Sequence, residues 1–117
     1  MAADDLTGDY VRVMALAELP DGRMRSCKVA DRDIVLCHVQ GQVYALDNVC
    51  THAFARMSEG RLRGVRLICP LHGASFDCRN GKVLGAPATR PLPVHSVRVT
   101  DGAVEVSLDP NAPPQNP

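Results

Sequence analysis

Cysteine and histidine occur together in two short segments of the chain, and both residue types bind transition metals. Cys50 and His52 are separated by one residue, Cys69 and His72 by two, and sixteen residues lie between the pairs. Two thiolates and two imidazoles can hold a [2Fe–2S] centre in which the cysteines bind one iron and the histidines the other. A neutral imidazole in place of an anionic thiolate makes the centre less negative, so it accepts an electron more easily. The spacing therefore predicts a one-electron redox centre held by two short loops.

A structural zinc site is the alternative for the same residues, since two cysteines and two histidines are a common tetrahedral zinc set. Zinc fingers usually keep like ligands adjacent, whereas this chain alternates cysteine and histidine within each half. A plant-type ferredoxin needs a C-x4-C-x2-C run, which the sequence lacks. The alternation favours the mixed iron–sulfur centre.

The pattern C-x-H-x16-C-x2-H resembles that of the Rieske [2Fe–2S] proteins, in particular the small ferredoxins of bacterial aromatic-ring dioxygenase systems. The resemblance covers residues 10–108 and includes Gly73 after the second histidine and the proline loop at 85–87. It implies an all-β fold, an antiparallel Rieske-type β-sandwich with a cluster-binding lobe over residues 49–90. It also implies one Rieske-type cluster, held by Cys50, His52, Cys69 and His72.

The same resemblance implies an electron carrier rather than an enzyme. Such a carrier passes single electrons from a flavin-containing NAD(P)H ferredoxin reductase to a terminal Rieske oxygenase of aromatic hydrocarbon catabolism. The alternatives are the small Rieske subunit of an NADH-dependent nitrite reductase and a zinc-binding interaction module. Stable association with a large sirohaem subunit would favour nitrite reductase, whereas salt-sensitive turnover with a reductase would favour the shuttle.

Four positions near the predicted ligands indicate a low reduction potential. High-potential Rieske proteins have disulfide-forming cysteines at the positions of Ala55 and Leu71, and hydroxyl donors at those of Ala74 and Phe76. Each missing donor leaves negative charge on sulfur less stabilised in the reduced state. We therefore expect a potential of about −150 mV, at the low end of the Rieske range.

Size and composition exclude several other classes of protein. A chain of 117 residues forms one domain and has no room for the mononuclear iron domain of the large oxygenases. No apolar run reaches membrane-spanning length and no secretion signal opens the chain, so we expect a cytoplasmic monomer without a membrane anchor. The 13 basic and 13 acidic residues balance, which gives no reason to expect nucleic acid as a partner.

Charge is nevertheless distributed unevenly along the chain. Residues 50–90 contain seven basic against two acidic residues, whereas residues 1–49 contain five against eight. The basic segment suits an acidic partner surface, although solvated arginines are an equally good interpretation. Phe54 and Leu71 are expected to lie at the apolar rim of a docking surface or to pack within the lobe.

The remaining cysteines and histidines are expected to be structural. Cys27, Cys37 and Cys78 are interpreted as small buried hydrophobes, because the cysteine count is odd and nothing indicates secretion. His38 and His95 lie on apolar strand faces, where a histidine is usually a satisfied core residue.

Short strands and tight turns dominate the rest of the sequence. We expect a type II′ turn at Gly41-Gln42 and type I′ turns at Asn80-Gly81 and Asp101-Gly102, and three hairpins at this spacing indicate an antiparallel sandwich. One helical turn is expected over residues 53–58. Residues 1–9 and the proline-rich residues 109–117 are predicted to be flexible tails. The expected strands are 10–14, 24–29, 33–40, 43–48, 75–78, 82–84, 94–100 and 103–108.

Overall fold

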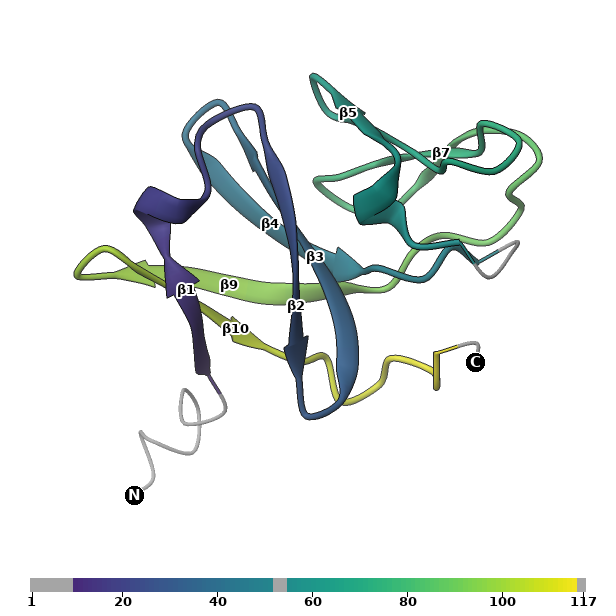
Figure 1. Ribbon diagram of the computed structural model, residues 1–117. Coiled ribbons are helices and arrows are strands. Elements are labelled where there is room, and N and C mark those ends of the chain that lie inside the picture. Colours follow the sequence, from purple (N-terminus) through teal and green to yellow (C-terminus); the bar gives the residue numbers. More distant parts are fainter. Residues whose placement is uncertain (1–9, 52–54, 116–117) are drawn as a thin grey trace.

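Alternating and continuous apolar segments form strands in the computed structural model, which describes residues 10–51 and 55–115 (Figure 1). Every strand pairs antiparallel with its neighbours, which confirms the predicted all-β antiparallel class. Two 3-10 turns, η1 (Leu16–Glu18) and η2 (Met57–Glu59), interrupt the strands. The strands are β1 (Val11–Ala15), β2 (Met24–Val29), β3 (Arg32–Val39), β4 (Gln42–Asp47), β5 (Arg61–Arg63), β6 (Arg66–Ile68), β7 (Ser75–Asp77), β8 (Val83–Gly85), β9 (Val94–Thr100) and β10 (Ala103–Ser107).

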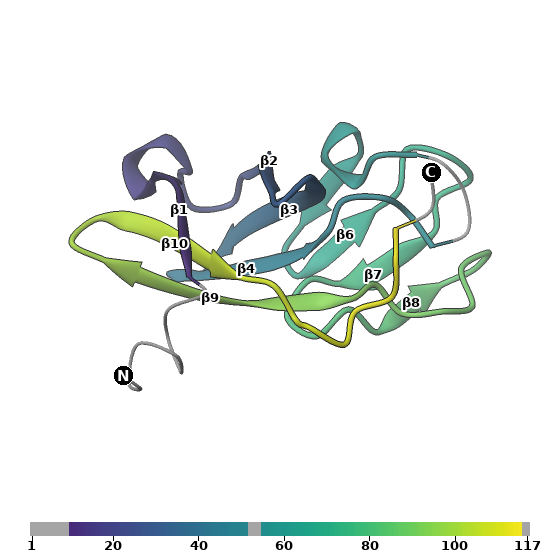
Figure 2. The same cartoon turned by 90° about the horizontal axis from the view of Figure 1, so that it is seen from below.

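The strands form two sheets. A six-stranded sheet in the order β1-β10-β9-β4-β3-β2 is called the base here, and a four-stranded sheet in the order β5-β6-β7-β8 is called the lobe. In both views the lobe lies beside one end of the base, away from β1 (Figures 1 and 2). None of the helical segments within the described ranges is long and apolar enough to span a membrane.

β3 is buried on both of its faces. Val35 packs in a core shared with Leu67 and Phe76 of the lobe, whereas Ile34 packs with Val104 in a second core inside the base. A strand with two buried faces is a continuous apolar run rather than an alternating one, as this segment is. β3 is therefore the wall that the two cores share.

The turn types predicted from the sequence can be compared with the backbone φ angles of the structure. Asp101 and Gly102 both have positive φ (52° and 76°) between paired Thr100 and Ala103, which confirms the type I′ turn. The prediction for the β3–β4 turn is wrong, because Val39 pairs with Gln42 and the central residues are Gln40 and Gly41. Both of these have positive φ (53° and 81°), so this turn is also type I′.

The β7–β8 turn also differs from the prediction. Gly81 has a positive φ of 76° but Asn80 does not, and residues 78–82 form a longer loop in place of a two-residue type I′ turn. The Asp77 carbonyl accepts hydrogen bonds from the N–H groups of Asn80 and Gly81 (3.3 and 2.7 Å), which closes this loop.

Other elements lacked a recognisable signal. The β2–β3 turn uses Ala30 and Asp31 at positive φ (49° and 68°), with no glycine to mark it. The strands β5 and β6 were not predicted, because three residues are too few for an alternating pattern to stand out. The helical turn expected over 53–58 overlaps the 3-10 turn η2 only at residues 57 and 58; residues 55 and 56 are not helical, and residues 53 and 54 lie outside the described ranges.

A buried ionic group ties the base to the C-terminal segment. Arg32 donates from Nε and Nη2 to the Asp47 carboxylate at 2.7 and 2.6 Å, and His95 Nε2 donates to the same carboxylate at 2.9 Å. The Asp109 N–H donates to His95 Nδ1 at 3.0 Å, so the imidazole is neutral with its proton on Nε2. His95 is thus the satisfied core histidine that the sequence predicted, and His38 likewise donates from Nδ1 to the Leu19 carbonyl at 2.7 Å.

The C-terminal segment, which the sequence analysis predicted to be a flexible tail, makes polar contacts with the base. Gln115 exchanges two hydrogen bonds with the backbone of Asp33, at 2.9 and 2.6 Å. Arg32 Nη2 also donates to the Pro113 carbonyl at 2.5 Å. Polar contacts therefore attach this segment to the base. The flexibility predicted for residues 109–117 and for residues 1–9 stays a prediction, and residues 1–9 lie outside the described ranges.

Replacing Asp47 by Asn is expected to lower the free energy of unfolding by about 3 kcal/mol at pH 7, because it leaves half-buried Arg32 without its counter-charge. Burial by itself would raise the pKa of the Asp47 carboxyl, but hydrogen bonds from His95 and Arg32, together with the charge of Arg32, lower it below 3.8. This stabilisation is present above the unfolded pKa and is lost as pH falls through the folded one. The difference between wild type and variant, measured by urea unfolding, should therefore narrow below about pH 4.

Glu105→Gln is the matched control, because it breaks the exposed Arg98–Glu105 pair and is expected to cost under about 1 kcal/mol. Equal costs for the two variants would contradict the role assigned to Asp47.

Candidate metal centre

The first predicted ligand segment follows β4 and is closed at its base by backbone pairing. Val49 and Arg56 form an isolated antiparallel bridge, and the Cys50 N–H donates to the Ala55 carbonyl at 2.9 Å. Cys50 itself has no exposed surface. Of the predicted residues in this loop, His52 and Phe54 lie outside the described ranges.

The second ligand segment is the β6–β7 connection. The Cys69 N–H donates to the Ala74 carbonyl at 2.7 Å, which continues the pairing of Ile68 with Ser75. His72 has a positive φ of 64° and is exposed, whereas Cys69 is buried. This loop thus holds its cysteine inside the lobe and its histidine at the surface.

The two loops bring the thiols of Cys50 and Cys69 together. Burial raises the pKa of the Cys69 thiol to about 11, a hydrogen bond from Leu71 opposes the rise, and the neighbouring Cys50 thiol adds to it. The Leu71 N–H donates to Cys69 Sγ at 3.4 Å. Two buried thiolates side by side need a nearby cation, because the low-dielectric interior disfavours their charge.

These residues fit an iron–sulfur cluster. Thiolates select such clusters, imidazole suits iron, and a backbone N–H on a ligating sulfur is a typical supporting contact. Within the described ranges no group of three or more Cys, His, Asp or Glu side chains converges, and His52 is not among the residues described. The structure therefore joins two of the four predicted ligands and places His72 on the loop beside them.

The other three cysteines are Cys27, Cys37 and Cys78. Cys37 and Cys78 are completely buried, as predicted, and their thiols contact each other. Cys27 is half-buried, and burial together with the charge of Asp33 raises the pKa of its thiol to about 11. No disulfide joins any of the five cysteines, all of which are described.

A polar network that the sequence analysis missed holds the first loop against the base. Asn48 is fully buried, and its Nδ2 donates to Asp33 Oδ1 at 3.1 Å and to Ser58 Oγ at 3.0 Å. The Ser58 N–H donates back to Asn48 Oδ1 at 2.7 Å, and Arg56 Nε donates to Asp33 Oδ2 at 2.9 Å. No local pattern marks these residues, because Asp33 is 23 positions from Arg56.

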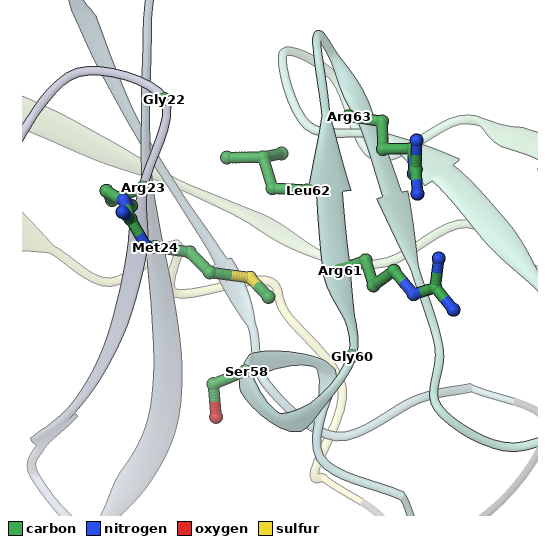
Figure 3. A pocket seen from close by; sticks show the side chains of 8 residues that line it. All are labelled: Gly22, Arg23, Met24, Ser58, Gly60, Arg61, Leu62 and Arg63. Atoms are coloured by element: carbon green, nitrogen blue, oxygen red, sulfur yellow. The ribbon is translucent and has the colours of Figure 1, made fainter.

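A groove of about 500 Å³ lies where the base meets the lobe, away from the thiols. Met24 and Leu62 point into it from β2 and β5, whereas Arg61 and Arg63 extend on the other side of β5 (Figure 3). Its lining contains no cysteine or histidine, so it is the joint between the sheets rather than a redox site. A second groove, of about 490 Å³, runs beside Cys69 and Gly73.

Gly81 fixes the β7–β8 loop against the segment between β8 and β9. It has a positive φ, its carbonyl accepts a hydrogen bond from the Leu92 N–H at 2.9 Å, and an added Cβ would lie 2.1 Å from the Leu92 carbonyl oxygen. The backbone of the β7–β8 loop thus contacts the backbone of the segment between β8 and β9 at Leu92.

Comparison with known proteins shows which family the chain resembles over most of its length. The model of the Rieske [2Fe–2S] domain matches residues 9–97. The ferredoxin component of the naphthalene 1,2-dioxygenase system of Pseudomonas aeruginosa is 37% identical over 103 residues, covering 88% of this chain and 99% of that protein. The 3-phenylpropionate/cinnamic acid dioxygenase ferredoxin subunit of Photorhabdus laumondii is 42% identical over 97 residues, covering 82% and 91%.

Among solved structures, a chain in the complex of reduced oxygenase and oxidized ferredoxin in carbazole 1,9a-dioxygenase superimposes with a TM-score of 0.80. It is 34% identical and the match covers 85% of this chain and 93% of that one. The ferredoxin of carbazole 1,9a-dioxygenase from Nocardioides aromaticivorans gives a TM-score of 0.82 at 28% identity, covering 86% and 98%.

Gly81→Ala is expected to destabilise the protein by several kcal/mol, roughly 3 or more, because the added methyl meets backbone that has no room to move. Gly102→Ala is the matched control: its φ is equally positive (76°), but nothing lies within 4 Å of the added Cβ. The control should cost only about 1–2 kcal/mol of backbone strain. Similar urea midpoints for the two variants would show that close approach at Gly81 is unimportant.

Proposed function

The chain belongs to the Rieske [2Fe–2S] domain family, and from that premise we propose that it is the ferredoxin component of an aromatic-ring dioxygenase system. It carries single electrons and has no substrate of its own. The single observation that best supports this function is the pair of adjacent buried thiols of Cys50 and Cys69 beneath a loop that exposes His72.

One Rieske-type [2Fe–2S] cluster is the cofactor of this family, and we propose Cys50, His52, Cys69 and His72 as its ligands. When bound, the cluster supplies a one-electron couple. The chain keeps water from the sulfur side by burying both cysteines, and the Leu71 N–H stabilises negative charge on Cys69. Leu71 is 46% exposed beside His72, so a partner that docks there meets an apolar contact next to a proposed ligand.

The partners follow from the same premise. A related ferredoxin is named in a complex with its oxygenase, and we extend that pairing to a terminal Rieske oxygenase for this chain. A flavin-containing NAD(P)H ferredoxin reductase is the proposed electron donor, with the carrier acting as a cytoplasmic monomer. The nitrite reductase alternative is not favoured, because the relatives named above are dioxygenase ferredoxins.

The test of this function is voltammetry of the anaerobically purified protein. We expect a reversible one-electron couple at about −150 mV, with Cys50→Ser and Cys69→Ser each abolishing it through loss of a thiolate ligand. Cys27→Ser is the matched control, because this thiol belongs to the base and should leave the couple unchanged. A metal-loaded wild type without a couple would instead support the zinc site, and retention of the couple in both ligand variants would refute the proposed ligands.

The low potential is tested by restoring a missing hydroxyl. Phe76 is fully buried in the same core cluster as Cys50 and Cys69. A tyrosine hydroxyl there that donates to sulfur would stabilise the reduced state by about 1 kcal/mol, which raises the potential by about 40 mV. Phe76→Leu controls for altered packing without adding a donor. An unchanged potential in a stably folded Phe76→Tyr variant would count against this position as a determinant.

A further inference from the structure

We propose that Arg90 is a positioning residue for the redox centre: it orients the first ligand loop and places a positive charge beside it. This inference rests on the proposed function, because it takes Cys50 and His52 as ligands. Arg90 lies in the segment that joins β8 to β9, which Figure 1 shows in green running past the loop that follows β4.

Arg90 and Thr51 exchange hydrogen bonds. Arg90 Nη2 donates to the Thr51 carbonyl oxygen at 2.8 Å, and the Thr51 hydroxyl donates to the Arg90 carbonyl oxygen at 2.7 Å. Each residue therefore binds the backbone of the other, across 39 positions of sequence. Two hydrogen bonds in opposite directions fix the relative orientation of the two loops, which a single bond does not.

Thr51 stands between the proposed ligands Cys50 and His52. The Thr51 carbonyl group, which accepts the hydrogen bond from the Arg90 guanidinium, immediately precedes His52 in the chain. Arg90 therefore restrains the backbone at the residue before the proposed histidine ligand. On the other side, the Cys50 N–H is held by the Ala55 carbonyl at 2.9 Å. Arg90 thus completes the restraint of a loop whose inner end is already fixed.

The segment that carries Arg90 is itself anchored. Two residues further on, the Leu92 N–H donates to the Gly81 carbonyl at 2.9 Å, and Ala88 is buried in the core cluster that contains Cys50 and Cys69. An anchored support transmits orientation to the loop it binds, whereas a mobile one would follow that loop.

The charge of Arg90 is not neutralised by a neighbour. Among residues 10–51 and 55–115, no Asp or Glu forms an ion pair with it. Asp109 and Arg90 both line a groove of about 360 Å³, but they do not form an ion pair. A cation beside a redox centre favours the form that carries one more negative charge. Arg90 is exposed, so solvent and salt screen this effect and keep it modest.

The experiment compares Arg90→Gln and Thr51→Val with wild type in the isolated holoprotein, where no partner contributes. For Arg90→Gln we expect about a threefold lower ratio of reduced to oxidised protein at a fixed applied potential. This corresponds to a reduction potential lower by about 30 mV. We also expect a broadened electron paramagnetic resonance signal, because the loop samples more orientations. Thr51→Val keeps the charge and loses one hydrogen bond, so it should broaden the signal while shifting the potential less.

Arg63→Gln is the matched control, because it removes the same charge from an exposed site on β5. Arg90→Lys should recover the potential, since lysine keeps the charge, but only part of the line shape, since it lacks the planar fork. The inference would be overturned if Arg90→Gln and Thr51→Val had the same potential and spectrum as Arg63→Gln and wild type. The proposed function would then still stand. Absence of any couple in the wild type would overturn the proposed function and the inference with it.

Discussion

Burial of β3 on both faces is the constraint on which the rest of this structure depends. One face packs with Val104 and its neighbours in the base, and the other packs with Leu67 and Phe76 of the lobe. The lobe sheet has only three residues in each strand and does not enclose a core by itself. It is stable because β3 and β4 supply the opposite wall, and the same core contains both proposed thiolate ligands.

The ligand loops bury their cysteines in this apolar core, and hydrogen bonds set the orientation of the rest of each loop. Asp33 and Asn48 fix the base of the first loop, Arg90 binds Thr51 within it, and the Leu71 N–H reaches the sulfur of Cys69 in the second. Hydrogen bonds impose direction, whereas apolar packing is tolerant of small shifts, and a redox centre needs fixed ligand positions. The apolar core therefore buries the cysteines, and the hydrogen bonds orient the loops that carry the proposed ligands.

The described geometry suits an electron carrier, because His72 lies exposed on its loop, where a partner can reach it. A protein that exchanges electrons with two partners in turn needs its centre near the surface and a small, reversible docking area. The exposed Leu71 beside His72 is consistent with such an area.

The sequence by itself determined which ligands we propose, because the choice of thiolate and imidazole and their spacing are local properties of two short segments. It also determined the all-β class, through period-two alternation and the Asp101-Gly102 turn. It misplaced the β3–β4 turn by one residue, since both Gln40-Gly41 and Gly41-Gln42 offer a glycine and only strand register selects between them. The Ala30-Asp31 turn was not found, because cross-strand pairing imposes positive φ there without a residue that favours it. Only the tertiary structure decided the contacts of Asp33 with Arg56, of Thr51 with Arg90 and of Asp33 with Gln115. These pairs are 23, 39 and 82 positions apart, and no local pattern encodes a hydrogen bond between groups that meet only after the sheets have packed.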